Sequence, residues 1–350
     1  MTSITVRYAT NRSYNPSQKG RLKFGPRFHP DGPSFYRVGT ASVRRLAKGE
    51  GQYVLSGYDV EPEQPPEGRT KEKIGSAKIF DGLREGMATN KVDVIVYLHG
   101  FDNTFESCLE RLAEVVDKYR LPPDGGEARQ AFGFAFSWPS DGEMVPFKSY
   151  HSDREDAAFS GIAMARALLR LTDYLAKNKN DLCEQRIHLV AHSMGNWALR
   201  HAVLGLKTLS NWYNLPRIFE HVFLMGADED ADAFESDTKL RLLTQLARSI
   251  HVYYASDDGA LKISDLTKGN PDRLGHHGPR TMDGIDSRVD AIDCTAVSST
   301  SLSHLNHQYY RLRPEVIDDV CAVLAGKPSD SIAGREVIQS GRRFRLKGAA

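Results

Sequence analysis

Serine 193 stands at the junction between a short apolar run and a segment with helical spacing. Residues 187–192 read I-H-L-V-A-H, and M-G-N follows the serine. Two small residues flank it at matching distances, Ala191 before and Gly195 after. A serine on a sharp strand-to-helix turn needs small neighbours there, because larger side chains would collide with the adjacent strands. The pattern A-x-S-x-G therefore indicates a nucleophile elbow with Ser193 as the attacking hydroxyl.

A serine hydroxyl is a weak nucleophile at neutral pH, so this chemistry needs a general base and an acid that orients the base. Imidazole has a suitable pKa, and His307, just ahead of the last expected helix, is the favoured base, with His304 as its rival. For the acid we favour Asp258, which follows an expected strand and precedes G-A-L. Asp257 and Asp228 remain alternatives, because a single loop aspartate is more often a cap or loop residue.

Acyl transfer also needs backbone donors for the negative charge that develops on the carbonyl oxygen. The amide of Met194, at the start of the helix after the serine, is one candidate. The amide of Phe101, in the loop after His99 and Gly100, is the other. We interpret His99 as a hydrogen-bonding support for that loop and His192 as a structural residue.

The expected wall of the substrate site combines apolar and polar groups. It consists of Phe101, Asp102, Trp138, Tyr150 and the irregular segment 262–288. For Trp138, at the end of an expected strand, plain core packing is an equally good interpretation. The apolar members favour a modest acyl or aromatic group, and Asp102 adds polar contacts.

No metal or cofactor pattern accompanies these residues. His276 and His277 are adjacent in a Gly/Pro-rich segment near Asp272, which is a weak ligand pattern and is better explained as a surface loop. Neither G-x-G-x-x-G nor a P-loop is present. The sequence therefore predicts a site without metal or cofactor that acts on a small-molecule ester.

The elements that must hold these groups alternate between strand and helix. The expected core strands cover residues 92–98, 131–138, 187–191, 221–225, 251–255 and 289–297. The expected helices cover residues 105–119, 156–176, the segment after Ser193, 239–248 and 314–324. This alternation is typical of an α/β fold with a mostly parallel, doubly wound sheet. Ligands bind such sheets at the carboxyl ends of the strands, where Ser193, Asp258 and His307 would meet.

The chain divides into three parts by composition. Residues 1–90 are expected to form an N-terminal extension of short strands and loops, with strands at 4–8 and 35–40, packed on the core. Residues 91–325 are the expected core, in which the irregular segment 259–288 is a candidate lid or loop. Residues 326–350 form a basic C-terminal tail, interpreted as a solvated terminus.

Bulk properties are those of an ordinary soluble globular protein of 350 residues, 40% of them hydrophobic and 26% charged. A net charge of +1 gives no argument for nucleic acid. The first residues lack a signal peptide's apolar segment, and no apolar run approaches the ~18 residues of a membrane span. The 4 cysteines lie far apart, which predicts reduced thiols. We expect a cytoplasmic protein without nucleic-acid or membrane partners; the sequence leaves its oligomeric state open.

Several segments, in this order, resemble the bacterial α/β-hydrolase family of unknown function. They are Y-A-T-N-R at 8–12, V-Y-L-H-G-F-D at 96–102, F-S-W-P-S at 136–140, Y-H-S-D at 150–153, A-H-S-M-G at 191–195, Y-A-S-D-D-G-A-L at 254–261 and H-Q-Y-Y at 307–310. The resemblance implies a serine hydrolase fold and a triad of Ser193, Asp258 and His307, and little about the substrate. Two features depart from the family pattern: Ala191 replaces the first elbow glycine, and the segment after Asp258 is long.

Two classes of function fit these residues. The first is a carboxylic-ester hydrolase that works through an acyl-enzyme on Ser193; the same site could serve a thioester, an amide or acyl transfer to an alcohol. The second is a non-catalytic relative that binds a ligand or a partner protein. The intact serine, histidine, acid and oxyanion loop favour the enzyme.

Overall fold

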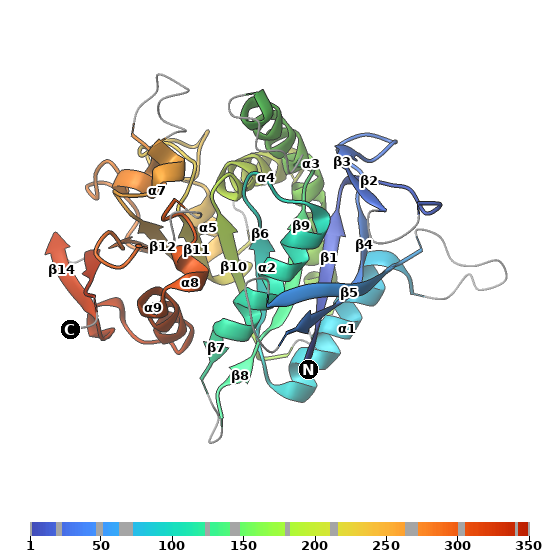
Figure 1. Cartoon of the computed structure of the whole chain (residues 1–350), viewed down its shortest axis with the longest axis horizontal. Coiled ribbons are helices and arrows are strands. Elements are labelled where there is room, and N and C mark those ends of the chain that lie inside the picture. Colours follow the sequence, from blue (N-terminus) through green and yellow to red (C-terminus); the bar gives the residue numbers. More distant parts are fainter. Residues whose placement is uncertain are drawn as a thin grey trace.

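A computed structural model describes residues 2–18, 23–46, 52–62, 73–122, 127–140, 148–178, 183–210, 216–262, 272–299, 305–339 and 342–348. Its centre is an 11-stranded sheet that runs across the whole molecule (Figure 1). In spatial order the strands are β14 (Arg335–Gln339), β15 (Arg343–Leu346), β13 (Val289–Asp293), β12 (Ala247–Tyr254), β11 (Phe219–Met225), β10 (Ile187–His192), β6 (Val94–Leu98), β9 (Phe132–Ser137), β1 (Ser3–Thr10), β4 (Arg37–Arg45) and β5 (Tyr53–Val60).

The sheet is parallel from β15 to β1, and β14, β4 and β5 are the antiparallel strands at its two edges. The expected α/β fold with a mostly parallel sheet is therefore confirmed. The two smaller sheets pair β2 (Arg12–Tyr14) with β3 (Phe24–Phe28) and β7 (Arg120–Leu121) with β8 (Arg129–Gln130).

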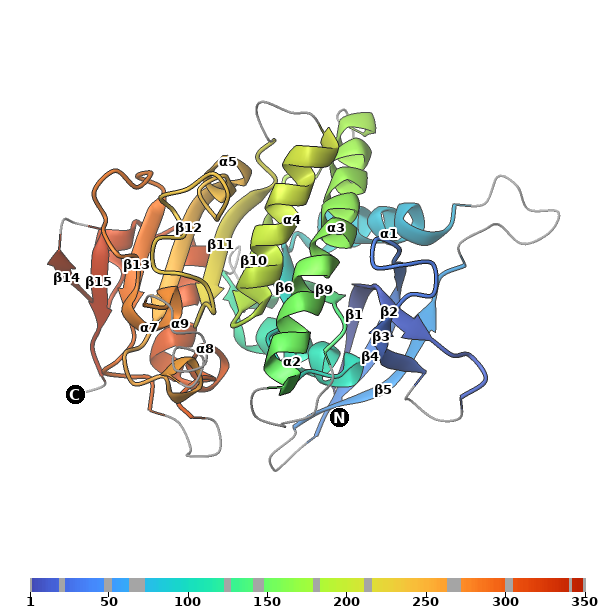
Figure 2. The same cartoon turned by 90° about the horizontal axis from the view of Figure 1, so that it is seen from above.

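Helices cover both faces of the sheet (Figure 2). On one face lie α1 (Gly75–Asn90), α3 (Lys148–Lys177), α4 (Gly195–Ser210) and α5 (Leu243–Leu246). On the other lie α2 (Phe105–Lys118), α8 (Tyr309–Leu312) and α9 (Pro314–Leu324). Alternate residues of one strand enter the two resulting cores; Leu98 of β6 packs in the first and Tyr97 in the second.

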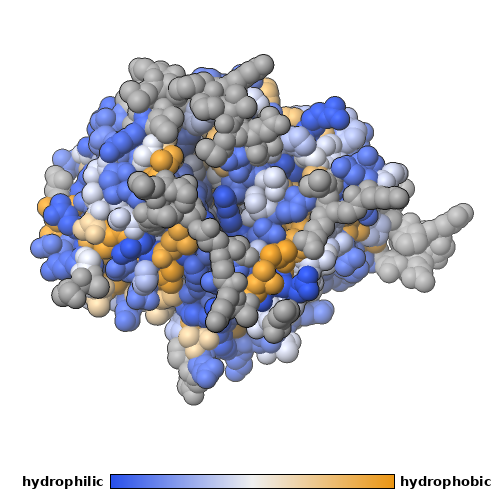
Figure 3. All heavy atoms as spheres, viewed as in Figure 1, coloured by the Kyte–Doolittle hydropathy of each residue, from blue (hydrophilic) through white to orange (hydrophobic). Residues whose placement is uncertain are grey.

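Because helices pack on both faces of the sheet, the central strands carry apolar side chains on both sides. The outer surface differs. Figure 3 shows that the viewed face is largely hydrophilic, with apolar residues in separate groups. Within the described part of the chain, no helix combines the length and apolar composition needed to cross a bilayer.

The N-terminal part is more closely joined to the core than the sequence predicted. Strand β1 pairs in parallel with β9, so it belongs to the main sheet instead of packing on it. Helix α1 also lies in this part and was not expected. Its buried residues Ile79, Leu83 and Met87 are spaced four apart, which places them on one face of the helix. The glycines Gly82 and Gly86 obscured this pattern, because glycine lowers helix propensity.

The basic segment 326–350 is not a solvated tail, and that interpretation was wrong. Strand β15 pairs in parallel with β13, and β14 pairs with β15, so the segment extends the sheet. Its arginines lie on alternate positions of β15, while Phe344 and Leu346 are buried. The helix expected at 239–248 is also short, because Ala247 already begins β12.

Three histidines line up across adjacent strands in the interior: His188, His221 and His251. The rings of His188 and His221 stack with centroids 5.2 Å apart. His221 also hydrogen-bonds through Nδ1 to Ser249 Oγ at 2.7 Å. Burial, with a smaller contribution from His188, lowers the pKa of His221 from 6.5 to about 3. The folded protein therefore holds His221 uncharged over most of the acidic range.

Acid is expected to unfold the protein partly through this group. The unfolded chain takes up a proton at His221 below pH 6.5 and the folded chain only near pH 3, so the free energy of unfolding falls as the pH falls between those values. Urea unfolding from pH 7 to pH 4 should show a shallower loss for His221→Gln than for the wild type. His277→Gln, at an exposed histidine, is the control. Parallel loss in all three proteins would contradict this prediction.

Candidate active site

The serine turn has the strained geometry that its sequence predicted. Ser193 adopts φ 54°, a left-handed backbone conformation that residues other than glycine seldom adopt. It follows β10 directly, and its amide donates a hydrogen bond to Met225 O of the neighbouring strand at 2.9 Å. The side chain of Asn196 donates to the carbonyl oxygens of Ala191 (3.1 Å) and Ser193 (3.0 Å). These bonds hold both sides of the turn.

Gly195 allows the turn to pack against the end of β6. A Cβ there would lie 2.6 Å from His99 O and 2.7 Å from Leu98 O, so no larger residue fits without movement of the backbone. Gly100 makes the matching approach from the other side. A Cβ at Gly100 would lie 2.7 Å from the Cβ of Ser193, which places this loop directly beside the serine.

The two amides expected to stabilise an oxyanion lie on these two segments. Met194 follows the serine and precedes α4, and Phe101 follows Gly100. Neither amide donates a hydrogen bond to any residue in the described ranges. The carbonyl of Phe101 is fixed by Asn103 Nδ2 at 2.7 Å. An acyl-transfer site requires two such backbone amides next to the serine, available to bind an oxyanion.

His99 supports the Phe101 loop from within the core. Its Nδ1 donates to Gly100 O at 2.8 Å, and its Nε2 accepts from the amide of Trp138 at 3.1 Å. Burial lowers the pKa of His99 well below its usual value, which keeps the ring neutral and able to do both. The indole of Trp138 stacks on the ring and donates to His99 O at 3.0 Å. Trp138 is fully buried, so its position matches core packing and not an open pocket wall.

Arg12, from the Y-A-T-N-R segment, braces the same loop and was not singled out from the sequence. Its guanidinium is buried and donates to Asn103 O at 2.6 Å, Ser137 Oγ at 3.0 Å and Ser140 O at 3.2 Å. It therefore joins the ends of β1 and β9 to the loop after β6. The N-terminal strands are thus part of the support for the site.

His307 and Asp258 form a hydrogen-bonded pair although 49 residues separate them. Nδ1 of His307 lies 2.6 Å from Oδ2 of Asp258, and the carboxylate is fully buried. The second oxygen of Asp258 accepts the amide of Leu261 at 3.2 Å. An aspartate that fixes Nδ1 leaves Nε2 of the imidazole available as a base.

Asp257 binds the loop that precedes His307, called here the histidine loop, and does not bind the imidazole. It accepts Asn306 Nδ2 at 3.0 Å and Ser298 Oγ at 2.5 Å. Leu305 and Asn306 both have positive φ, 49° and 56°, so the chain turns sharply before His307. His304, the rival base, lies outside the described residues.

His192, next to the serine, links the elbow to the histidine loop. Its Nε2 donates to the carbonyl of His307 at 3.1 Å, and the two rings lie 4.6 Å apart. On its other side it stacks on Tyr310 with centroids 4.4 Å apart. Burial lowers the pKa of His192 well below its usual value, so it acts here as a neutral donor.

Gly226 brings the serine and the histidine–aspartate pair to one place. It follows Met225, the partner of the Ser193 amide, and has φ 50°. A Cβ at Gly226 would lie 3.2 Å from His307 Cε1 and 3.4 Å from Asp258 Oδ2. The structure therefore gathers Ser193, His307 and Asp258 at the carboxyl ends of β10, β11 and β12.

Asp228 lies beside the serine but faces other partners. Its amide donates to Ser193 O at 3.1 Å, while its carboxylate accepts the hydroxyl of Tyr150 and lies 3.6 Å from Arg273 Nε. The ring of Tyr150 lies 5.9 Å from that of Phe101. Tyr150, Phe101 and Asp228 thus form one partly polar wall next to the elbow.

Asp102 follows Phe101 and also has a left-handed backbone, with φ 57°. Its amide donates to Asp153 Oδ2 at 3.4 Å, and partial burial raises the pKa of its carboxyl. Of the other expected wall segment, 262–288, residues 263–271 lie outside the described ranges; in the rest, α7 (Leu274–His277) is mostly buried. His276 is buried and donates through Nε2 to Ser256 O at 2.7 Å, so the surface-loop interpretation is wrong for this histidine, whereas His277 is exposed. The described residues contain no cluster of three metal-ligating side chains.

Residues 80–326 match the model of a family described as "Alpha/beta hydrolase of unknown function (DUF900)". A solved structure of the product of the gene lin2722 from Listeria innocua is 13% identical with a TM-score of 0.35, covering 73% of this chain and 99% of that one. Carboxyl esterase 2 (TmelEST2) from the mycorrhizal fungus Tuber melanosporum is 12% identical with a TM-score of 0.28, covering 90% and 76%. A search of curated proteins found no match.

The close packing at Gly195 gives a direct test of the elbow. Gly195→Ala should lower the free energy of unfolding by about 1–3 kcal/mol, because the new methyl group meets backbone atoms of Leu98 and His99. Gly82→Ala, in α1 where nothing lies within 4 Å, should instead leave it unchanged or raise it by up to about 1 kcal/mol. Urea unfolding at neutral pH measures both. Equal effects of the two substitutions would exclude the packing described.

Proposed function

The chain belongs to this alpha/beta hydrolase family, and from that premise we propose that it is a serine hydrolase that cleaves a carboxylic ester. The observation that carries the proposal is the hydrogen-bonded pair of His307 and Asp258 beside a serine in a strained turn. Ser193 is the nucleophile, His307 the general base and Asp258 the acid that orients it. Asp257 and Asp228 have other partners, which favours Asp258.

In the first half of the reaction, Ser193 Oγ attacks the carbonyl carbon of the ester as Nε2 of His307 takes its proton. The oxygen that becomes negative is stabilised by the amides of Phe101 and Met194. The imidazolium is stabilised by Asp258. When the tetrahedral intermediate collapses, the bond to the alcohol oxygen breaks and His307 returns the proton to the leaving alcohol.

In the second half, water attacks the acyl group on Ser193 while His307 again removes a proton. The same amides hold the oxyanion; on collapse the bond to Ser193 Oγ breaks, His307 returns the proton to that oxygen, and the carboxylic acid leaves. Phe101 and Tyr150 are proposed to contact the substrate, with Asp102 as a polar neighbour. Trp138 is proposed to support the His99 ring from the core and not to contact the substrate, because its indole stacks on that ring.

A fluorophosphonate probe tests the nucleophile directly, because it phosphonylates an activated serine. The wild type should be labelled at Ser193, and Ser193→Ala should remain unlabelled. Ser160→Ala, at another buried serine, is the matched control and should label like the wild type. No labelling of folded wild type would reject the hydrolase and leave the ligand-binding alternative. Turnover of p-nitrophenyl esters of increasing chain length then defines the acyl group.

The choice of acid is tested by three matched substitutions. Asp258→Asn should lower kcat for a p-nitrophenyl ester about 10³- to 10⁴-fold, because the imidazole loses its orienting carboxylate. Asp257→Asn and Asp228→Asn should each cost less than about tenfold, since neither carboxylate binds His307. Circular dichroism and thermal melting confirm that each variant folds. Near-wild-type turnover of Asp258→Asn would show that the acid is assigned to the wrong residue.

A further inference from the structure

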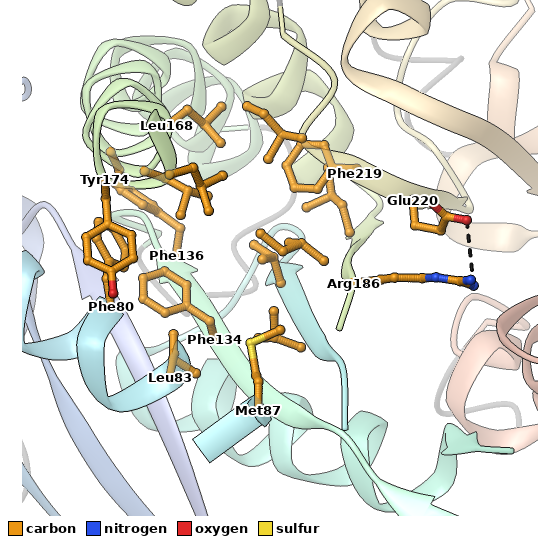
Figure 4. A pocket seen from close by; sticks show the side chains of 18 of the residues that line it. Phe80, Leu83, Met87, Phe134, Phe136, Leu168, Tyr174, Arg186, Phe219 and Glu220 are labelled. Atoms are coloured by element: carbon orange, nitrogen blue, oxygen red, sulfur yellow. Dashed lines mark ion pairs between the residues drawn. The ribbon is translucent and has the colours of Figure 1, made fainter. Parts of the chain in front are cut away.

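An apolar cavity of about 380 Å³ lies between the sheet and helices α1 and α3 (Figure 4). This volume falls in the range of roughly 300–1,000 Å³ that small-molecule sites occupy. Aromatic and aliphatic side chains enclose it from several elements, including Phe80, Met87, Phe134, Phe136, Leu168 and Phe219.

The lining of the cavity extends along both the sheet and a helix. On β6 its lining runs from Val94 to Leu98, which spans about 13 Å at the rise of a strand. On α3 it runs from Met164 to Leu175, about 16 Å at the rise of a helix. A lining that is apolar over this length suits an unbranched aliphatic chain better than a compact polar molecule.

Four charged residues belong to the lining, and three of them are basic. They are Arg84, Arg186, Arg217 and Glu220. Two of them, Arg186 and Arg217, are exposed and precede β10 and β11, so the cavity opens at the amino ends of these strands. Figure 4 shows the Arg186–Glu220 pair to one side of the apolar group; the pair is 3.6 Å apart.

The single glutamate does not cancel this positive charge. Glu220 is also 3.2 Å from Arg248, so two arginines already compensate it. Arg217 forms no ion pair with any residue in the described part of the chain and is free to meet an anion. Arg84 is held at the lining by Tyr174, whose hydroxyl accepts its Nε at 3.1 Å.

The mouth of this cavity is separate from the serine site. Ser193 lies at the carboxyl end of β10, whereas the basic mouth lies at the amino end, about 20 Å away along a strand of six residues. Among the described residues that line the cavity, none is Ser193, Asp258 or His307. A ligand bound here would therefore leave the serine accessible.

We propose that this cavity binds a fatty acid, with the hydrocarbon chain along β6 and α3 and the carboxylate at the Arg217 end. The apolar lining takes the chain out of water, which drives binding. Exposed arginines attract the carboxylate and set its direction. The proposal does not depend on the chemistry of Ser193.

Binding is measured with 11-(dansylamino)undecanoic acid, whose fluorescence rises in an apolar site, in the Ser193→Ala protein so that no turnover interferes. Laurate should displace the probe, and dodecanol, which lacks the carboxylate, should bind about 3- to 10-fold more weakly. Arg217→Glu should weaken laurate to a similar extent. Arg170→Glu, at an exposed arginine of α3 outside the lining, should have no effect.

A second pair of variants locates the bound chain. Ala167→Phe fills the cavity and should abolish saturable binding, whereas Ala88→Phe, on the exposed side of α1, should retain it. Circular dichroism checks folding, and if Ala167→Phe does not fold, the Arg217→Glu comparison decides. Absence of saturable binding, equal affinity for laurate and dodecanol, or unchanged binding in Ala167→Phe would each overturn the proposal. Fluorophosphonate labelling is read independently, so failure here leaves the hydrolase proposal intact.

Discussion

The left-handed backbone of Ser193 is the constraint on which the rest of the site depends. Such a conformation costs a non-glycine residue about 1–3 kcal/mol and persists only where the surroundings over-determine it. Here the Ser193 amide is fixed by Met225 across the sheet, and Asn196 ties the two carbonyls of the turn. Gly195 and Gly100 let two backbone segments close around the serine. Contacts at the carboxyl ends of the central strands thus stabilise the strained turn. The loops that surround the serine also begin at these strand ends.

Those loops are held by buried polar contacts that reach across the whole molecule. His99 and Arg12 secure the Phe101 loop from beneath, and Arg12 comes from the N-terminal strands. His192 secures the His307 loop from the elbow itself. Burial keeps the His99 and His192 rings neutral, which avoids the cost of a buried charge. The fold therefore places the serine, the imidazole and the two free amides with few degrees of freedom.

Local sequence patterns predicted those parts of the site whose conformation depends on residues nearby in the sequence. The apolar run before Ser193 and the small residues around it are local signals, and alternation of strands and helices follows from periodicity. The pattern failed where a segment depends on distant partners. The basic segment containing Phe344 became strand β15 because β13 offered an open edge. Helix α1 was hidden by its glycines, although Ile79, Leu83 and Met87 carried the helical spacing.

The sequence by itself determined the type of sheet, the turn at Ser193 and the order of the polar groups at the strand ends. It favoured Asp258 as the acid but left Asp257 and Asp228 as alternatives, because each is a carboxylate that follows a strand. Only the tertiary structure decided which of them meets His307, because a hydrogen bond between residues 49 apart depends on how two loops fold over the sheet edge. The same holds for the cavity that opens at the amino ends of the strands, because no local pattern encodes its volume.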